Sequence, residues 1–390
     1  MRAQRLRRRL VRQLVEEDVL HDEAWAEAFA TVPRHAFLPR FFVPAGTGWA
    51  AVDRGDPDWL DRVYSREVLV TQLDDDPARW DRARAHGPVP GVPTSSSSMP
   101  AIMAIMLEEL LVRDGDRVLE IGTGTGYNAG LLCHRCGSGQ VSTVDIDATI
   151  AAAAQERLAS CGYEPACATG DGALGFPAGV LFDRVLCTAS VSRIPLAWLE
   201  QTLPGGHIVT TLNRPLGGGL VRLTVGEGAT AEGQVLARDG RFMPLRAHRL
   251  PPLADLPDAA ATQWRPTEVS MSDVLKPQRH FEFFASLELP DVRPVHVEPN
   301  GAFALSHADG SWARTRRTDS GFEAAQGGPR ALWDLAEDAH RRWESLGRPS
   351  RSRFGLTVNS EEQTFWLDDP QSENRWPLQG LKSDGGSANR

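Results

Sequence analysis

The chain has 390 residues, of which 41% are hydrophobic and 24% charged, and its formal net charge at pH 7 is −9. This length favours two or three domains with sizeable cores, and the composition is that of a soluble globular protein. The negative charge gives no global attraction to nucleic acid, and no apolar stretch approaches the roughly 20 residues that a membrane span needs.

The start of the chain is locally basic, with arginines at positions 2, 5, 7, 8, 9 and 12. One interpretation is a nucleic-acid-binding arm. The other, which the spacing favours, is the exposed face of an amphipathic helix that turns Leu6, Leu10, Val11 and Leu14 inward. No apolar signal-peptide core follows, and the five cysteines lack the spacing of a disulfide framework, so we expect a cytoplasmic protein.

Helices are predicted up to about residue 38, where VPRHAFLPR (32–40) ends the helical pattern with two prolines. Residues 44–93 are rich in Gly, Pro and Asp and are predicted to be irregular. Within them REVLVTQL (66–73) predicts a strand, and 74–91 is interpreted as an inserted loop. The segment TSSSSMP (94–100) is expected to be a loop before a buried helix over 101–112.

Strands and helices alternate from residue 116 to about 225, starting with the strand RVLEIG and the helix YNAGLLCHRC. This alternation predicts a doubly wound, mostly parallel sheet of the α/β class. Cys133 and Cys136 have the spacing of a redox or metal pair. Because they fall inside a predicted helix and no second pair completes a zinc site, packed, reduced cysteines are favoured and no metal is expected.

The alternation stops near residue 246. We therefore divide the chain into N-terminal helices with an insertion (1–93), an α/β core (94–249), a linker (250–266) and a separate α+β domain (267–390). Six tryptophans fall after residue 263. They are interpreted as the core of this domain, the alternative being a ligand platform.

The segment VLEIGTGTGYN (118–128) carries the main functional signal. A strand runs into a turn at Gly122, Gly124 and Gly126, where the lack of Cβ atoms lets backbone N–H groups approach a ligand closely. The next strand ends at Asp145, which suits two ribose hydroxyls. Dinucleotide sites favour G-x-G-x-x-G, whereas E-x-G-x-G-x-G with an acidic Glu120 fits a cofactor without phosphate. The pattern indicates S-adenosylmethionine.

The remaining cofactor candidates are Thr123, Ile146, Asp171 and Gly172. In GDG (170–172) the carboxylate would accept from the adenine amine, and the glycines leave room for the ring. The competing interpretation of Asp171 is a helix cap or turn residue. A nicotinamide oxidoreductase and a non-catalytic peptide-binding protein are the rival function classes; neither explains the full set of these residues.

Together these residues resemble the protein-L-isoaspartate O-methyltransferase family. VPRHAFLP is similar to its N-terminal signature, and TSSSSMP followed by RDGDRVLEIGTGTGYN matches its order from active-site loop to glycine loop. The resemblance covers about residues 5–249 and implies a Rossmann-like fold, S-adenosylmethionine as cofactor and an aspartyl-type carboxylate as acceptor. It places Ser98, with Ser97 beside it, on the active-loop serine that contacts the acceptor; helix capping is the alternative role.

The C-terminal part resembles extended members of the family that are associated with ribosomally synthesised, modified peptides, through GGPRALWDL, RFGLTV and WLDDP. That resemblance implies a modified precursor peptide as partner, of the ω-ester (graspetide) kind, in which methylation of one L-aspartate leads to an aspartimide. The alternative is isoaspartyl protein repair. The sequence leaves the oligomeric state open.

Overall fold

The structure is a computed structural model that describes residues 1–177, 179–250, 263–276, 280–297 and 302–378. Contacts divide the chain into two compact units. The first comprises Met1–Ala189, Pro195–Thr210 and Thr224–Ala229, and the second comprises the rest. None of the helices in the described ranges is long and apolar enough to cross a membrane.

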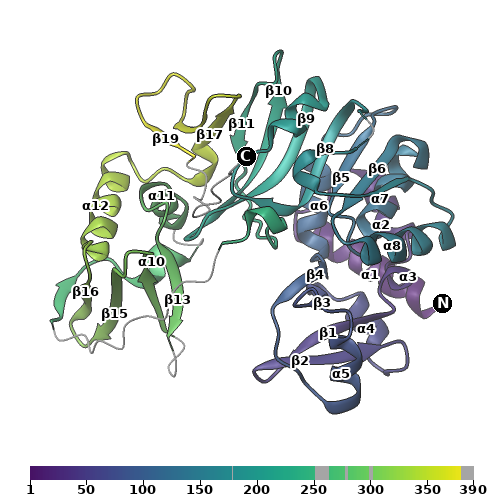
Figure 1. Cartoon of the computed structure of the whole chain (residues 1–390), viewed down its shortest axis with the longest axis horizontal. Coiled ribbons are helices and arrows are strands. Elements are labelled where there is room, and N and C mark those ends of the chain that lie inside the picture. The colour runs from purple at the N-terminus through teal and green to yellow at the C-terminus, as the bar shows by residue number, and fades with distance from the viewer. Residues whose placement is uncertain (178, 251–262, 277–279, 298–301, 379–390) are drawn as a thin grey trace, which may run out of the picture. The chain divides into compact units, whose positions relative to one another are not determined.

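The first unit begins with three helices and a small antiparallel sheet in the order β2-β1-β3-β4 (Figure 1). In the first helix Leu6, Leu10 and Leu14 are buried, which confirms the amphipathic-helix interpretation of the basic start. The bounds in this part are α1 Arg2–Glu16, α2 Glu23–Thr31, α3 Arg34–Phe37, β1 Arg40–Ala45, β2 Gly48–Asp53, α4 Trp59–Val63, β3 Leu69–Leu73, α5 Arg79–His86 and β4 Pro93–Ser97.

This small sheet is a correction to the sequence analysis. Residues 44–93 are not irregular, the inserted loop at 74–91 contains α5, and the serine segment is a strand rather than a loop. The sheet has its own core of Phe42, Val70, Leu73 and Ala83, with partly buried Trp49 and Trp80 packed against it.

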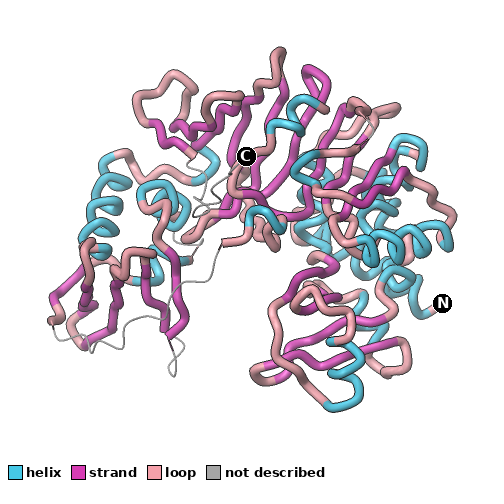
Figure 2. The backbone as a smooth tube through the Cα atoms, in the orientation of Figure 1, coloured by secondary structure: helices cyan, strands magenta, loops and turns pink. Residues whose placement is uncertain are grey.

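The larger sheet of the first unit has neighbouring strands in the order β9-β8-β5-β6-β7, and β8, β5, β6 and β7 run parallel. Figure 2 shows strands in magenta and helices in cyan. This confirms the predicted Rossmann-like α/β fold. The bounds are α6 Pro100–Glu109, β5 Val118–Ile121, α7 Tyr127–Cys136, β6 Val141–Asp145, α8 Ala148–Ser160, β7 Ala166–Thr169, β8 Phe182–Val191, α9 Leu196–Glu200 and β9 Thr202–Asn213.

Local sequence explains the two helices that flank the site. The four residues of β5 are all buried, and α7 begins where Gly126 adopts a left-handed conformation. At the start of α8 the Asp147 side chain accepts from the N–H groups of Thr149 and Ile150, which caps the helix. The carboxyl ends of the parallel strands therefore meet the amino ends of these helices at one edge of the sheet.

The second unit contains strands in the order β19-β18-β17-β11-β10 and a separate antiparallel sheet in the order β12-β16-β15-β14-β13. The pairing of β11 with β17 means that contacts divide the chain differently from the predicted boundary near residue 250. Most of the predicted linker, 251–262, lies outside the described residues. The strand bounds are β10 Gly218–Val225, β11 Ala231–Val235, β12 Arg265–Thr267, β13 Arg293–Val297, β14 Ala302–Ser306, β15 Trp312–Thr318, β16 Gly321–Gly327, β17 Phe354–Val358, β18 Gln363–Leu367 and β19 Arg375–Pro377.

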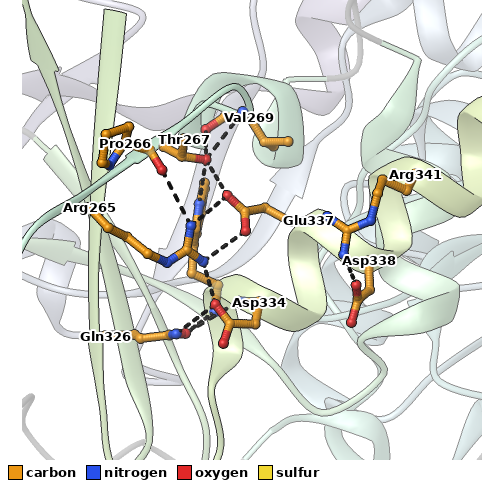
Figure 3. Close-up of polar contacts among 10 residues, drawn as sticks. Arg265, Pro266, Thr267, Val269, Gln326, Asp334, Glu337, Asp338 and Arg341 are labelled. Atoms are coloured by element: carbon orange, nitrogen blue, oxygen red, sulfur yellow. Dashed lines mark hydrogen bonds and ion pairs between the residues drawn. The ribbon is translucent and has the colours of Figure 1, made fainter.

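Three helices, α10 Met271–Leu275, α11 Phe281–Glu288 and α12 Leu332–Ser345, complete this unit. Arg265 donates to both carboxylate oxygens of Glu337 on α12, at 3.0 and 2.7 Å (Figure 3). The Trp333 indole N–H donates to the Thr267 hydroxyl at 2.9 Å. Five of the six tryptophans in this region are buried, Trp264 alone being partly exposed, which supports a core role over a ligand platform.

Candidate cofactor and acceptor site

The turn between β5 and α7 is built from glycines in left-handed backbone conformations. The φ angles of Gly122, Gly124 and Gly126 are 94°, 52° and 86°. A Cβ atom on Gly122 would lie 2.9 Å from the Thr188 hydroxyl oxygen, and that hydroxyl donates to the carbonyls of Ile121 and Gly122 at 3.2 and 2.8 Å. The turn is thus held from the neighbouring strand β8. We propose that this turn is the cradle for an adenosyl cofactor.

Asp145 closes one side of this cradle at the carboxyl end of β6. One carboxylate oxygen accepts from the backbone N–H of Gly124 at 2.9 Å, and the other accepts from that of Asp147 at 3.0 Å. The side chain of the following residue, Ile146, is 40% exposed. Each carboxylate oxygen has a second lone pair, so Asp145 can hold the glycine turn and still accept from two ribose hydroxyls.

Asp171 lies at the same edge of the sheet, because the backbone of Gly170 hydrogen-bonds to the Asp145 carbonyl at 2.9 Å. One Asp171 oxygen accepts from the N–H of Ala173 at 2.9 Å and caps a short 3-10 turn. The interpretation of Asp171 as a cap is therefore correct for this one oxygen. The other oxygen makes no hydrogen bond within the described part of the chain and remains open to the proposed adenine amine. The buried Trp198 donates to the Gly172 carbonyl at 2.7 Å and fixes the turn.

Glu120 lies beneath the glycine turn rather than on its surface. Its side chain is fully buried, and its oxygens accept from the Asn128 amide at 2.8 Å and the Thr143 hydroxyl at 2.7 Å. Thr123, which is also buried, shares a 2.7 Å hydrogen bond with Thr143. We propose that Glu120 and Thr123 position the turn from below.

Burial raises the pKa of Glu120 to about 7, against the opposing effect of its two hydrogen bonds. The folded protein therefore binds a proton that the unfolded chain, with a pKa near 4.5, releases. The resulting stabilisation is complete below pH 4.5 and is lost as the pH rises through 7, by about 3 kcal/mol in total. We expect Glu120→Gln, which can still accept from the Asn128 amide and can donate its own amide N–H to the Thr143 hydroxyl oxygen, to remove this dependence. Parallel slopes of unfolding free energy against pH from 5 to 8 in both proteins would contradict the raised pKa.

The serine segment lies directly against the glycine turn. In β4 the carbonyl oxygen of Ser96 is 3.6 Å from the position that a Cβ on Gly124 would take. Helix α6 starts after Met99 with a proline and has no side-chain cap, so Ser98 does not cap it. Within the described residues the Ser98 hydroxyl makes no hydrogen bond, and the residue is partly exposed. Ser97 is buried. The Ser98 hydroxyl is therefore available to an acceptor.

A buried arginine that the sequence analysis missed holds this segment in place. Arg34 is fully buried and donates to the Ser97 hydroxyl at 3.2 Å and the Ser98 carbonyl at 3.1 Å. It also donates to the carbonyls of Val63 and Ser65, at 2.9 and 3.3 Å. Burial lowers its pKa to about 10, so the guanidinium stays charged at pH 7 and places a positive charge beneath the serines.

The structure thus brings the predicted residues together at one edge of the sheet and adds Arg34, Thr188 and Trp198 as supports. Arg34 could have been noticed in the sequence as an arginine inside the apolar segment VPRHAFLP. No pattern in the surrounding sequence indicates the roles of Thr188 and Trp198. All five cysteines are free, and burial raises the pKa of Cys133 to about 12 and that of Cys136 to about 11, so neither thiol is reactive at neutral pH.

Comparison with known proteins places these features in one family. The family described as protein-L-isoaspartate(D-aspartate) O-methyltransferase matches residues 86–238. Similar relatives are the protein-L-isoaspartate O-methyltransferases of Methylorubrum extorquens, 39% identical over 42% of this chain and 68% of the relative, and of Ignicoccus hospitalis, 30% identical over 52% and 80%.

A solved protein-L-isoaspartate O-methyltransferase has a similar fold, with a TM-score of 0.53 and 21% identity. The match covers 93% of this chain and all of that one. Because so little of the chain is left out, the match must extend well into the residues after 250. The C-terminal part of the chain therefore has a counterpart in the fold of that protein.

Proposed function

Because the chain belongs to the protein-L-isoaspartate O-methyltransferase family, we propose that it esterifies the free α-carboxylate of an L-isoaspartyl residue in a protein or peptide. Membership makes the chain an S-adenosylmethionine-dependent carboxyl O-methyltransferase. The identity of the acceptor is the proposal. The names of its relatives support the isoaspartyl acceptor. The observation that carries the site is the free Ser98 hydroxyl just after β4, whose Ser96 lies against the glycine turn.

The residues present fit the cofactor. Gly122 and Gly124 would leave room for it, Asp145 would accept from its ribose and Asp171 from its adenine. When bound, S-adenosylmethionine supplies an electrophilic methyl group on a sulfonium. The rest of the chemistry concerns the acceptor, whose carboxyl has a pKa near 3.9 in the unperturbed state and is ionised at pH 7. The chain therefore needs no general base.

The chain's own contribution is to hold that carboxylate. We propose that the Ser98 hydroxyl donates to one acceptor oxygen and leaves the other free to attack, while the Ser97 hydroxyl, fixed by Arg34, donates from below. The buried guanidinium favours a negative charge at this place because its own charge is poorly screened by water. Positioning and exclusion of water then account for the rate.

Ser98→Ala tests this assignment. Loss of one hydrogen bond to a charged group should slow turnover about ten- to a hundredfold, while the affinity for S-adenosylmethionine and the melting temperature stay nearly unchanged. Ser96→Ala is the matched control, since Ser96 is also partly exposed and lies two residues away. If melting falls and turnover per folded molecule does not, Ser98 has only a structural role.

A second candidate acceptor is an L-aspartate in a constrained ribosomal peptide, for example one with ω-ester cross-links. The methyl ester of this aspartate would close to an aspartimide. The observation that favours it is the structure outside the region 86–238, which includes β1, β2, β3 and the five-stranded sheet of the second unit and much of which the solved relative shares. We propose that this extra structure recognises a large peptide. Cross-links would lower the entropy cost of ring closure.

Mass spectrometry of two peptides separates the acceptors. For the isoaspartyl proposal we expect methylation of a linear isoaspartyl peptide and none of its L-aspartyl isomer. The constrained-peptide alternative instead requires a methyl gain on a cross-linked L-aspartyl peptide, followed by loss of methanol to a product that hydroxylamine traps. If only the cross-linked peptide reacts, the isoaspartyl proposal is wrong.

A further inference from the structure

A cavity of about 120 Å³ lies in the first unit, beside the glycine turn but on the side of the small sheet. Its wall is formed by Gly124 and Thr125 of the turn, by Ser95 of β4 and by one face of α8 that ends in Arg157. A cavity of roughly 150 Å³ holds a ring the size of benzene, so this one fits a single side chain and not an adenosyl cofactor. Asp145 and Asp171, the residues that we assign to the cofactor, do not line it.

The cavity is cationic. Arg157 is partly buried, and within the described residues its guanidinium makes no hydrogen bond or ion pair. Arg40, also in the wall, stacks on Trp80 with its guanidinium carbon 5.0 Å from the ring centroid and reaches Asp81 at 3.5 Å, a weak and largely exposed pair. The carboxylate in the wall, Asp76, is already paired with Arg82 at 3.2 Å.

The charges around Arg157 are unfavourable without a ligand. Burial lowers its pKa, and Arg40 and Arg54 lower it further, against a smaller opposing effect of Glu156. An anion in the cavity would relieve this repulsion and replace the water that Arg157 loses on burial. The aromatic Trp80 and Phe42 in the same wall suit the carbon chain of a side chain better than a bare inorganic ion.

The position of the cavity links it to the acceptor. Ser95 in the cavity wall and the acceptor-binding Ser98 are three residues apart on and just after β4. An extended chain rises about 3.3 Å per residue, so a peptide running beside this segment would place a side chain about three residues from the acceptor over the cavity.

We propose that this cavity is a specificity subsite that binds an acidic side chain of the acceptor peptide, through Arg157 and Arg40. The inference rests on the proposed function, because it takes the acceptor to be a carboxylate held by Ser98. The enzyme should then favour acceptors that carry a Glu or Asp about three residues from the methylated one.

The test uses the full-length protein and isoaspartyl hexapeptides that differ only by Glu or Gln at each position around the acceptor. At one position about three residues away, Glu should lower KM about five- to tenfold relative to Gln, with kcat unchanged. Arg157→Gln should reduce this ratio to about one without changing the affinity for S-adenosylmethionine, and Arg157→Lys should restore part of it. Arg9→Gln, an equal change of charge on an exposed helix position, should leave the ratio as it is.

A Glu preference that survives in Arg157→Gln, or no preference at any position, would refute the subsite. So would competition by inorganic phosphate that depends on Arg157 and is the same for Glu and Gln peptides, since the cavity would then serve a free anion. If no isoaspartyl peptide is methylated at all, the proposed function fails by itself. Binding of the same labelled peptides, followed by fluorescence anisotropy, still decides whether Arg157 selects the acidic one.

Discussion

Arg34→Met is expected to destabilise the first unit by about 3–5 kcal/mol, because two buried and two partly buried acceptors lose their donor. Those acceptors are the carbonyls of Val63, Ser65 and Ser98 and the Ser97 hydroxyl. The loss of a buried cation, which is itself costly to desolvate, offsets part of the effect. Because the serine segment loses its anchor, turnover per folded molecule should also fall, at least as far as in Ser98→Ala.

Denaturant unfolding and turnover of the purified variant measure both effects. Arg34→Lys keeps the charge but cannot make four hydrogen bonds, and it should lie between the wild type and the methionine variant. Arg9→Met makes the same chemical change at an exposed position and should be nearly neutral. A stable, fully active Arg34→Met protein would show that the guanidinium neither holds nor polarises the serine segment.

Asp145→Ala is expected to weaken S-adenosylmethionine binding about a hundredfold, or about 3 kcal/mol. The substitution removes the proposed ribose acceptor and also frees the backbone N–H groups of Gly124 and Asp147, so the glycine turn loses a support at the same time. Titration calorimetry with the cofactor measures the change.

Two further variants serve as controls for Asp145→Ala. Asp145→Asn keeps one acceptor oxygen and should lose less affinity. Asp114→Ala removes a carboxylate whose side chain is 94% exposed and should leave cofactor binding unchanged. An Asp145→Ala protein that is folded and binds the cofactor normally would remove this residue from the site.

The parallel core could be predicted from the sequence because its elements carry strong local patterns. β5 is a short run of buried residues and α7 is a longer one between two glycines, and the structure places both close to the predicted segments RVLEIG and YNAGLLCHRC. The candidate cofactor residues come together because the carboxyl ends of parallel strands share one edge. The order of the strands in the sheet is therefore enough to predict that these residues lie close together.

The small sheet could not be predicted in the same way. β1 and β2 contain Pro, Gly and Asp at or next to their ends, and β4 contains three serines, which are weak strand formers. Their strand conformation comes from pairing with each other and from the core around Phe42 and Leu73. The role of Arg34 depends on contacts with residues some 30 and 60 positions away, and no local pattern indicates them.

The supports of the glycine turn also fix when this enzyme can become active during its synthesis. A ribosome releases the amino-terminal helices and the serine strand first. Thr188, which holds the carbonyls of Ile121 and Gly122, emerges only after a further 66 residues have followed the turn. A nascent chain that stops before β8 therefore contains every residue that we assign to the cofactor. Its glycine turn still lacks the hydrogen bonds from Thr188 that hold it in place.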